Sequence, residues 1–189
     1  SLPRAGIGVR SPIPGLHVPF ARRTERPMAN EHLSPRASLI TVGEVAPDFT
    51  LLDQNKSEWK LSDAVRKGDV ALCFVPFAST GVCSTEMKCI STDLAAWTAK
   101  GATVVAIDCD SMFANKAWAE KEGYTHTILA DLHRAVCKTF GLYWADMNVA
   151  TRGTVVIGKD SGGKGKVKFA ESRAPGNAMN WDDVLALIS

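Results

Sequence analysis

Several features that would place a protein in a specialised class are missing from this sequence. No stretch approaches the roughly eighteen consecutive apolar residues that a membrane-spanning helix needs. No two of the five cysteines form a CxxC pair, and the four histidines do not stand at zinc-finger spacing from them. A chain of 189 residues that is 46% hydrophobic can bury a core of its own, so a disulfide scaffold is not expected. These absences leave one soluble globular domain suited to a reducing compartment.

The body of the chain has no excess of positive charge, and the net positive charge lies at its beginning. Residues 1–38 contain six arginines, no lysine and two acidic residues, a balance of +4. The other 151 residues carry 16 basic and 18 acidic side chains, a balance of −2. The body therefore offers no basic surface for a nucleic acid, and we expect no such partner.

Residues 1–38 form an Arg/Pro-rich leader that differs in kind from the body, residues 39–189. Six of the nine prolines lie in the leader, where they forbid a continuous helix. An Arg-rich, acid-poor, Ser-containing N-terminus is typical of an organelle transit peptide. We therefore expect an organellar protein, mitochondrial in preference to plastid, with the cytoplasm as the alternative. Two other interpretations are a docking extension that holds the chain in a larger assembly, and a plain tail.

Strand-like and helix-like segments alternate through the body. Apolar runs rich in β-branched residues, and a Gly-rich turn near the end, predict strands at 46–52, 70–75, 102–107, 127–129, 154–157 and 167–170. Apolar residues three or four apart predict helices at 83–98, 111–122, 132–140 and 181–188, and a short helix from residue 61 capped by Ser62 or Asp63. This order predicts an α/β sandwich, with a central mixed β-sheet flanked by helices and an extended N-terminal leader.

One cysteine, Cys83, stands where a thiol can become reactive. It follows the short loop 76–82 that leaves a buried strand, and the residues after it have helical spacing. Cys83 should therefore lie in the first turn of a helix, where free backbone N–H groups and the helix dipole favour an anion. The thiolate anion is the nucleophilic form of cysteine. On this reasoning alone, a reactive thiol and a buried structural cysteine are equal interpretations.

Pro76, Thr80 and Cys83 complete the pattern P-x-x-x-T-x-x-C, which resembles the signature of the peroxiredoxin family. Further segments that resemble this family, in the same order, are 45–51, 118–121, 129–131 and 152–157. The similarity covers residues 40–189. Gly81 before the cysteine and Arg-Gly-Thr on the late strand look closest to the one-cysteine, alkyl hydroperoxide reductase E-like branch.

This resemblance implies a thioredoxin-like fold and a thiol peroxidase that reduces hydrogen peroxide or organic hydroperoxides. The Cys83 thiolate would attack the peroxide and become a sulfenic acid. Thr80 would hydrogen-bond both thiolate and peroxide, Arg152 would stabilise the leaving oxygen, and Pro76 would shield the thiolate from water. Glu86, one helical turn after Cys83, is a candidate partner for an arginine, with a solvated surface residue as the alternative. This reaction requires no metal, flavin or haem.

The thiol that reduces the sulfenic acid is left open by the sequence. Cys89 lies six residues after Cys83, about 9 Å along a helix, whereas a disulfide needs Cα atoms within about 7 Å. Cys89 would therefore pair only if the helix unwound. Cys73 is expected in the core, and Cys109 and Cys137 are more often packing residues. We expect a one-cysteine cycle reduced by an external thiol of the thioredoxin, glutaredoxin or glutathione type, with Cys89 and Cys137 as candidate resolving thiols otherwise.

Two other functions compete with a free peroxidase. A thioredoxin-type disulfide exchanger is disfavoured because the chain has no CxxC pair. A thioredoxin-fold accessory or structural subunit of a larger organellar assembly, anchored by residues 1–38, is compatible with the leader. The intact peroxiredoxin pattern indicates that the chemistry survives even in that setting. The resemblance also suggests a homodimer.

Overall fold

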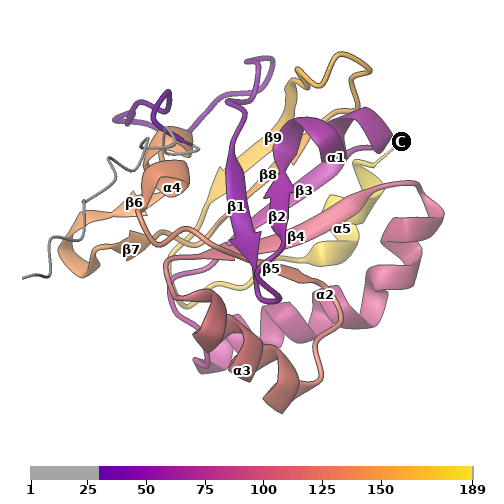
Figure 1. The fold of residues 1–189 in the computed structure, drawn as a ribbon. Coiled ribbons are helices and arrows are strands. Elements are labelled where there is room, and N and C mark those ends of the chain that lie inside the picture. The colour runs from indigo at the N-terminus through magenta and orange to yellow at the C-terminus, as the bar shows by residue number, and fades with distance from the viewer. Residues whose placement is uncertain (1–29, 189) are drawn as a thin grey trace, which may run out of the picture.

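The computed structural model of the chain describes residues 30–188, which form a seven-stranded sheet with helices on both faces and a separate two-stranded sheet of β6 (Tyr143–Trp144) and β7 (Val149–Ala150) (Figure 1). The strands are β1 Thr50–Asp53, β2 Glu58–Lys60, β3 Val70–Phe74, β4 Thr103–Asp108, β5 Thr127–Ala130, β6 Tyr143–Trp144, β7 Val149–Ala150, β8 Gly153–Ile157 and β9 Val167–Ser172. The helices are α1 Leu61–Lys67, α2 Gly81–Ala99, α3 Met112–Glu122, α4 Ala135–Phe140 and α5 Trp181–Ala186, with a short 3₁₀ turn at Ala145–Met147. Within this described part, no helix has the length and apolarity required to cross a membrane.

Seven strands make up the main sheet, in the order β2-β1-β5-β4-β3-β8-β9. β3 runs parallel to β4 and antiparallel to β8, so the predicted mixed sheet is confirmed. All five residues of β3 are buried, because helices cover the sheet on both sides. The carboxyl ends of β3 and β4 meet at one edge of the sheet, so the loops that follow them lie together.

Each face of the sheet carries its own hydrophobic layer. The α2 layer contains buried residues of three helices and two cysteines: Met87, Ile90, Trp97, Trp118, Trp181, Cys73 and Cys83. The α4 layer, on the opposite face, contains Leu61, Val65, Val136, Phe140, Cys109 and Cys137. Alternate residues of β3 divide between the two layers, as the pleat of a strand requires. The sheet therefore separates Cys83 from Cys137.

The start of α1 differs from the sequence prediction. A cap from Ser62 or Asp63 is wrong, because the N-cap residue is Lys60 and its side chain makes no capping hydrogen bond. The backbone N–H of Ser62 instead donates to Oδ1 of Asp48, at 2.8 Å. A side chain from outside the helix thus provides the cap, and local sequence does not reveal such a partner.

Other boundaries differ by a few residues. The Ser111 hydroxyl caps α3 by accepting from the Ala114 N–H at 3.1 Å, so the helix begins at Met112. The helix expected from residue 132 begins at Ala135, because Arg134 has a left-handed backbone, with φ of 55°. The short strands β2, β6 and β7 were not among the predicted elements.

The last part of the predicted leader, residues 30–38, lies on the body. The Asn30 side chain forms two hydrogen bonds with the backbone of Thr50, at 2.8 and 3.0 Å. Further along, the Arg36 N–H donates to the carbonyl oxygen of Lys138 at 3.1 Å. The transit-peptide and docking predictions fall mainly on residues 1–29, which lie outside the described residues, and both stay predictions.

Candidate active site

Cys83 lies in the first turn of α2, close to the carboxyl end of β3. The strand ends at Phe74, the loop 75–80 follows, and α2 begins at Gly81. Cys83 is thus the third residue of a 19-residue helix, and its side chain is 1% exposed. The N-terminal turn of a helix carries partial positive charge, which stabilises an anion placed there. The local sequence therefore brings the thiol to a position that favours a thiolate.

Arg152 approaches Cys83 from the neighbouring strand. It directly precedes β8, whose first residue, Gly153, pairs with Phe74 at the end of β3. Nη2 of Arg152 donates a hydrogen bond to Sγ of Cys83 at 3.1 Å, and Nε donates to the carbonyl oxygen of Pro175 at 2.9 Å. The Arg152 side chain is 1% exposed. Strand pairing thus brings together two residues that are 69 positions apart in the chain.

Glu86 lies behind this pair and is buried rather than solvated. Its Oε2 accepts a hydrogen bond from Nη1 of Arg152. Its Oε1 accepts from Nη2 of Arg173 at 3.2 Å and from the backbone N–H of Met179 at 2.8 Å. The carboxylate therefore holds Arg152 in the orientation that directs its Nη2 to Cys83.

The buried groups around Cys83 carry two positive charges, on Arg152 and Arg173, and one negative charge, on Glu86. The half-exposed Glu171 carboxylate lies 3.8 Å from Nη1 of Arg173 and adds a second negative charge further from the sulfur. Burial lowers the pKa of Arg173, but the ordinary value for arginine is so high that the side chain keeps its charge at neutral pH. Of these groups, Arg152 donates directly to the Cys83 sulfur, so a fixed positive charge lies beside the thiol.

Arg173 was missed by the sequence analysis, because a β-bulge determines where it lies. Ile157 pairs with Val167, but beyond the bulge each β8 residue pairs with one position further along β9. Arg173 consequently stands opposite Arg152, and its backbone N–H donates to the Arg152 carbonyl oxygen at 2.8 Å. Without the bulge, Ser172 would occupy this place. The pairing register of the β8–β9 hairpin is the sequence signal that could locate Arg173. The bulge shifts this register by one residue, so a regular hairpin would predict the wrong residue.

The two other residues of the predicted motif lie in the loop before α2. Pro76 is buried, and the neighbouring Ala78 N–H donates to Oδ2 of Asp110 at 3.0 Å, which fixes this loop to the one after β4. The exposed Thr80 hydroxyl donates to the carbonyl oxygen of Phe77 at 3.1 Å. The expected donation from Thr80 to Cys83 is therefore not the arrangement seen here, because the hydroxyl proton is used within the loop.

The remaining cysteines have environments different from that of Cys83. Cys73 faces the same layer from β3, and burial raises its pKa to about 12, so it stays protonated at neutral pH. Cys89 is exposed on α2. Sγ of Cys137 lies 4.0 Å from Sγ of Cys109, in the α4 layer across the sheet. All five cysteines are free thiols, and neither candidate resolving thiol contacts Cys83.

A buried histidine, His126, contacts two residues of α2. His126 is 2% exposed, and burial lowers its pKa to about 4, so the ring is neutral at pH 7. Its Nδ1 lies 2.7 Å from the Ser91 hydroxyl and its Nε2 lies 3.2 Å from Sδ of Met87. Because the Ser91 oxygen accepts from the Thr125 N–H, its proton is available for Nδ1. The neutral ring thus links β5 to the helix that carries Cys83.

Comparisons with known proteins agree with this geometry. Residues 42–169 match the sequence model of the AhpC/TSA family. The chain is 32% identical over 156 residues to alkyl hydroperoxide reductase E of Mycobacterium tuberculosis, which covers 80% of this chain and 99% of that protein. It is also 32% identical over 132 residues to the chloroplastic 2-Cys peroxiredoxin BAS1 of Spinacia oleracea, covering 65% of this chain and 50% of that protein. Its fold is similar to that of peroxidoxin BcpB from Mycobacterium tuberculosis, with a TM-score of 0.70 and 25% identity over 78% of this chain and 96% of that one.

Proposed function

The chain belongs to the AhpC/TSA family and is a thiol peroxidase, and from this premise we propose that Cys83 is the thiol that reduces the peroxide. The observation that carries the proposal is the 3.1 Å hydrogen bond from Arg152 to the Cys83 sulfur, at the start of α2. This contact combines a nucleophile with a fixed positive charge in a site that excludes most water. The other four cysteines have no comparable partner within residues 30–188.

In the proposed reaction, the Cys83 sulfur attacks the terminal oxygen of the hydroperoxide. An S–O bond forms while the O–O bond breaks, and the leaving oxygen takes up a proton and departs as water or an alcohol. Sulfur loses two electrons and becomes a sulfenic acid, and the peroxide gains them. Negative charge grows on the leaving oxygen during this step, and the guanidinium of Arg152 stabilises it because its donors already point at the reacting sulfur.

The loop before α2 supports this reaction in the proposed mechanism. Pro76 is buried beside the site and keeps bulk water from the thiolate. The Thr80 oxygen retains acceptor capacity while its proton binds the Phe77 carbonyl. Rotation of this exposed hydroxyl toward a bound peroxide would align the substrate with the sulfur, so we assign Thr80 to substrate orientation.

We further propose that an external thiol reduces the sulfenic acid, as in a one-cysteine cycle. Cys89 is exposed and lies beyond disulfide reach on an intact helix, Cys137 lies across the sheet, and Cys73 keeps its proton. A small thiol or a thioredoxin-like or glutaredoxin-like protein is the proposed reductant. Steady-state assays that offer each of these reductants separately would identify it.

Location and assembly are proposals of a different kind, because they rest on composition and family likeness. The Arg-rich, acid-poor residues 1–38 support import into an organelle, preferably the mitochondrion, and an anchoring role in a larger assembly. Likeness to peroxiredoxins supports a homodimer. Import assays with and without residues 1–38, and sedimentation of the purified chain, test these points separately.

The decisive experiment mixes the reduced protein with hydrogen peroxide and follows tryptophan fluorescence by stopped flow. We expect a fast transient whose rate rises with peroxide concentration and which is absent in Cys83→Ser. Cys89→Ser is the matched control, since it changes an exposed cysteine on the same helix, and it should react like the wild type. Mass spectrometry should then find a sulfenic acid on Cys83. A disulfide that includes Cys83 would contradict the one-cysteine cycle, and a transient that survives in Cys83→Ser would contradict the whole assignment.

A further inference from the structure

A second group of thiols lies across the sheet from Cys83. Cys109 follows β4, Asp131 follows β5 and Cys137 lies in α4, and all three residues are buried. Their ligand atoms, two sulfurs and a carboxylate oxygen, lie within 4.8 Å of one another. The peroxide chemistry uses none of them. We propose that these three residues bind one thiophilic divalent cation of the Zn²⁺ type, at a site separate from the peroxide-reducing centre.

The distance between the sulfurs fits a shared metal better than a disulfide. Sγ of Cys109 and Sγ of Cys137 are 4.0 Å apart. Two sulfurs that each lie about 2.3 Å from one tetrahedral zinc ion are about 3.8 Å apart. A disulfide would require the same atoms to approach to about 2.05 Å. The pair therefore needs only a small adjustment to bind a metal.

The surrounding hydrogen bonds orient the ligands. Oδ2 of Asp131 accepts from the Cys137 N–H at 2.8 Å, and Oδ1 accepts from the Val136 N–H at 3.3 Å. These bonds hold the carboxylate beside the two sulfurs, as hydrogen bonds around a metal site orient its ligands. The Cys137 thiol donates to the carbonyl oxygen of Arg134 at 3.5 Å. When a metal displaces that proton, the Arg134 oxygen still accepts from the Lys138 N–H at 3.2 Å.

The cluster contains no cation of its own. Asp131 is 1% exposed, and none of the ion pairs among residues 30–188 includes it. Its carboxylate accepts from backbone N–H groups of α4. A divalent cation would give the carboxylate and the two sulfurs a direct charged partner.

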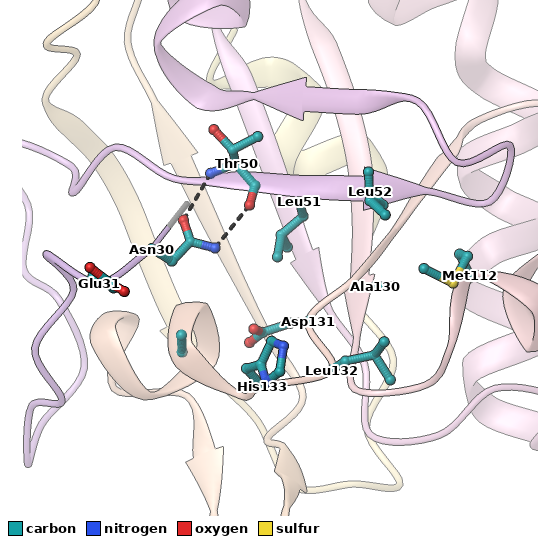
Figure 2. Close-up of a pocket in the computed structure, with 11 residues that line it drawn as sticks. Asn30, Glu31, Thr50, Leu51, Leu52, Met112, Ala130, Asp131, Leu132 and His133 are labelled. Atoms are coloured by element: carbon teal, nitrogen blue, oxygen red, sulfur yellow. Dashed lines mark hydrogen bonds between the residues drawn. The ribbon is translucent and has the colours of Figure 1, made fainter. Parts of the chain in front are cut away.

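A cavity reaches the cluster at one of its three residues, Asp131, and neither cysteine lines it. Asp131 lines a cavity of about 400 Å³ together with His133 and Ala135 on one side and Asn30 and Thr50 on the other. Figure 2 shows the Asp131 carboxylate near the α4 side of this cavity, below β1. The carboxylate side of the proposed site is therefore the side from which a cation and a fourth ligand, such as water, would approach.

The test titrates the full, reduced, chelator-treated chain with Co²⁺, a spectroscopic substitute for Zn²⁺. A cobalt–thiolate bond produces an intense sulfur-to-metal charge-transfer absorption. We expect this band to saturate at one equivalent, to be lost on addition of Zn²⁺, and to persist in Cys83→Ser and in Cys89→Ser. Cys109→Ser and Cys137→Ser should each abolish stoichiometric binding. Circular dichroism of both variants establishes that they are folded, and elemental analysis gives the metal content independently.

Thermal unfolding supplies a second measurement. Because a ligand that binds the native state stabilises it, Zn²⁺ should raise the unfolding temperature of the wild type and leave that of Cys137→Ser unchanged. Absence of a saturable band, or a band that survives in Cys109→Ser, would overturn the proposal. A chain that binds no metal but forms a Cys109–Cys137 disulfide on oxidation would also overturn it and would show a redox pair instead. None of these outcomes bears on Cys83, whose peroxide transient is measured separately.

Discussion

Replacement of Glu86 by glutamine isolates the role of one buried carboxylate. The two residues have the same shape, so the change removes a charge and exchanges one acceptor for a donor. Oε1 can continue to accept from Arg173 and Met179. The amide nitrogen then replaces Oε2 and meets the Nη1 donor of Arg152. The opposite orientation of the amide would place its nitrogen against the donors of both Arg173 and Met179. The orientation with the nitrogen facing Arg152 is therefore favoured, and Arg152 loses its hydrogen-bond acceptor.

The structure sets the expected magnitudes. Removing one partner of a buried ion pair costs about 3–5 kcal/mol of stability, and the value here should lie near 3 kcal/mol because two of the three hydrogen bonds remain. Misplacing Arg152 should slow peroxide reduction about 100-fold, similar to the loss of one hydrogen-bond donor to a developing oxyanion. The two guanidinium charges stay near the sulfur, so the thiolate itself should persist.

Three measurements separate these effects. Stopped-flow fluorescence gives the rate with peroxide, urea unfolding gives stability, and alkylation by iodoacetamide at neutral pH reports the thiolate without needing Arg152 to stabilise a leaving oxygen. We expect the peroxide rate to fall while alkylation stays close to the wild-type rate. Glu171→Gln is the matched control, because Glu171 is half-exposed and its Oε2 lies 3.8 Å from Nη1 of Arg173. This substitution should change the free energy of unfolding by less than about 1 kcal/mol.

Two results would refute this reasoning. If Glu86→Gln reduced peroxide at the wild-type rate, Arg152 would not depend on Glu86 for its position. If alkylation and peroxide reduction fell together, the carboxylate would act on the thiolate or on folding, and not on the transition state.

Three further predictions follow from neighbouring parts of the structure. Arg173→Lys should slow peroxide reduction less than Glu86→Gln does, because Glu86 keeps its direct bond to Arg152; an equal or larger loss in stopped flow would place Arg173 nearer the chemistry. A Cβ at Gly153 would lie 2.5 Å from the Leu142 side chain, so Gly153→Ala should lower both the free energy of unfolding and the rate of peroxide reduction. A Cβ at Gly81 would have no atom within 4 Å, so Gly81→Ala should raise the free energy of unfolding in urea by about 0.4–1 kcal/mol. Equal stabilities of the two variants would contradict this prediction. In the folded chain the pKa of His126 is about 4, against an ordinary value of 6.5. Between these two pH values only the unfolded chain binds the extra proton, so stability should fall as pH drops from 6.5 to 4, by up to about 1.4 kcal/mol per pH unit. Unfolding of His126→Gln measured across the same pH range should show a flatter slope.

The position of Cys83 could be predicted from sequence because its causes are local. A buried apolar run, a loop with a proline and a helical spacing place the cysteine in the first turn of a helix, and α2 begins two residues before it. Arg152 was found through likeness to a family, since nothing in its own neighbourhood distinguishes it from a surface arginine. Its approach to the thiol depends on the pairing of β3 with β8, a contact between distant segments.

Contacts that depend on three-dimensional detail escaped the sequence analysis. The cap of α1 comes from Asp48, which lies well outside the helix. The Thr80 hydroxyl donates to the Phe77 carbonyl oxygen, a partner that depends on the path of the loop before α2. Arg173 depends on a bulge of one residue, and hydrophobic alternation alone does not specify where such an irregularity occurs.

The same bulge makes β9 tolerant of a change in length during evolution. Between the pairs Ile157–Val167 and Val156–Phe169, β9 uses one residue more than β8 does. If one residue of β9 were deleted, the strand could straighten and still bring Arg173 opposite Arg152. An insertion has no such remedy, because a second bulge would be needed to restore the pairing. Homologous chains should therefore lose a residue from this strand more readily than they gain one.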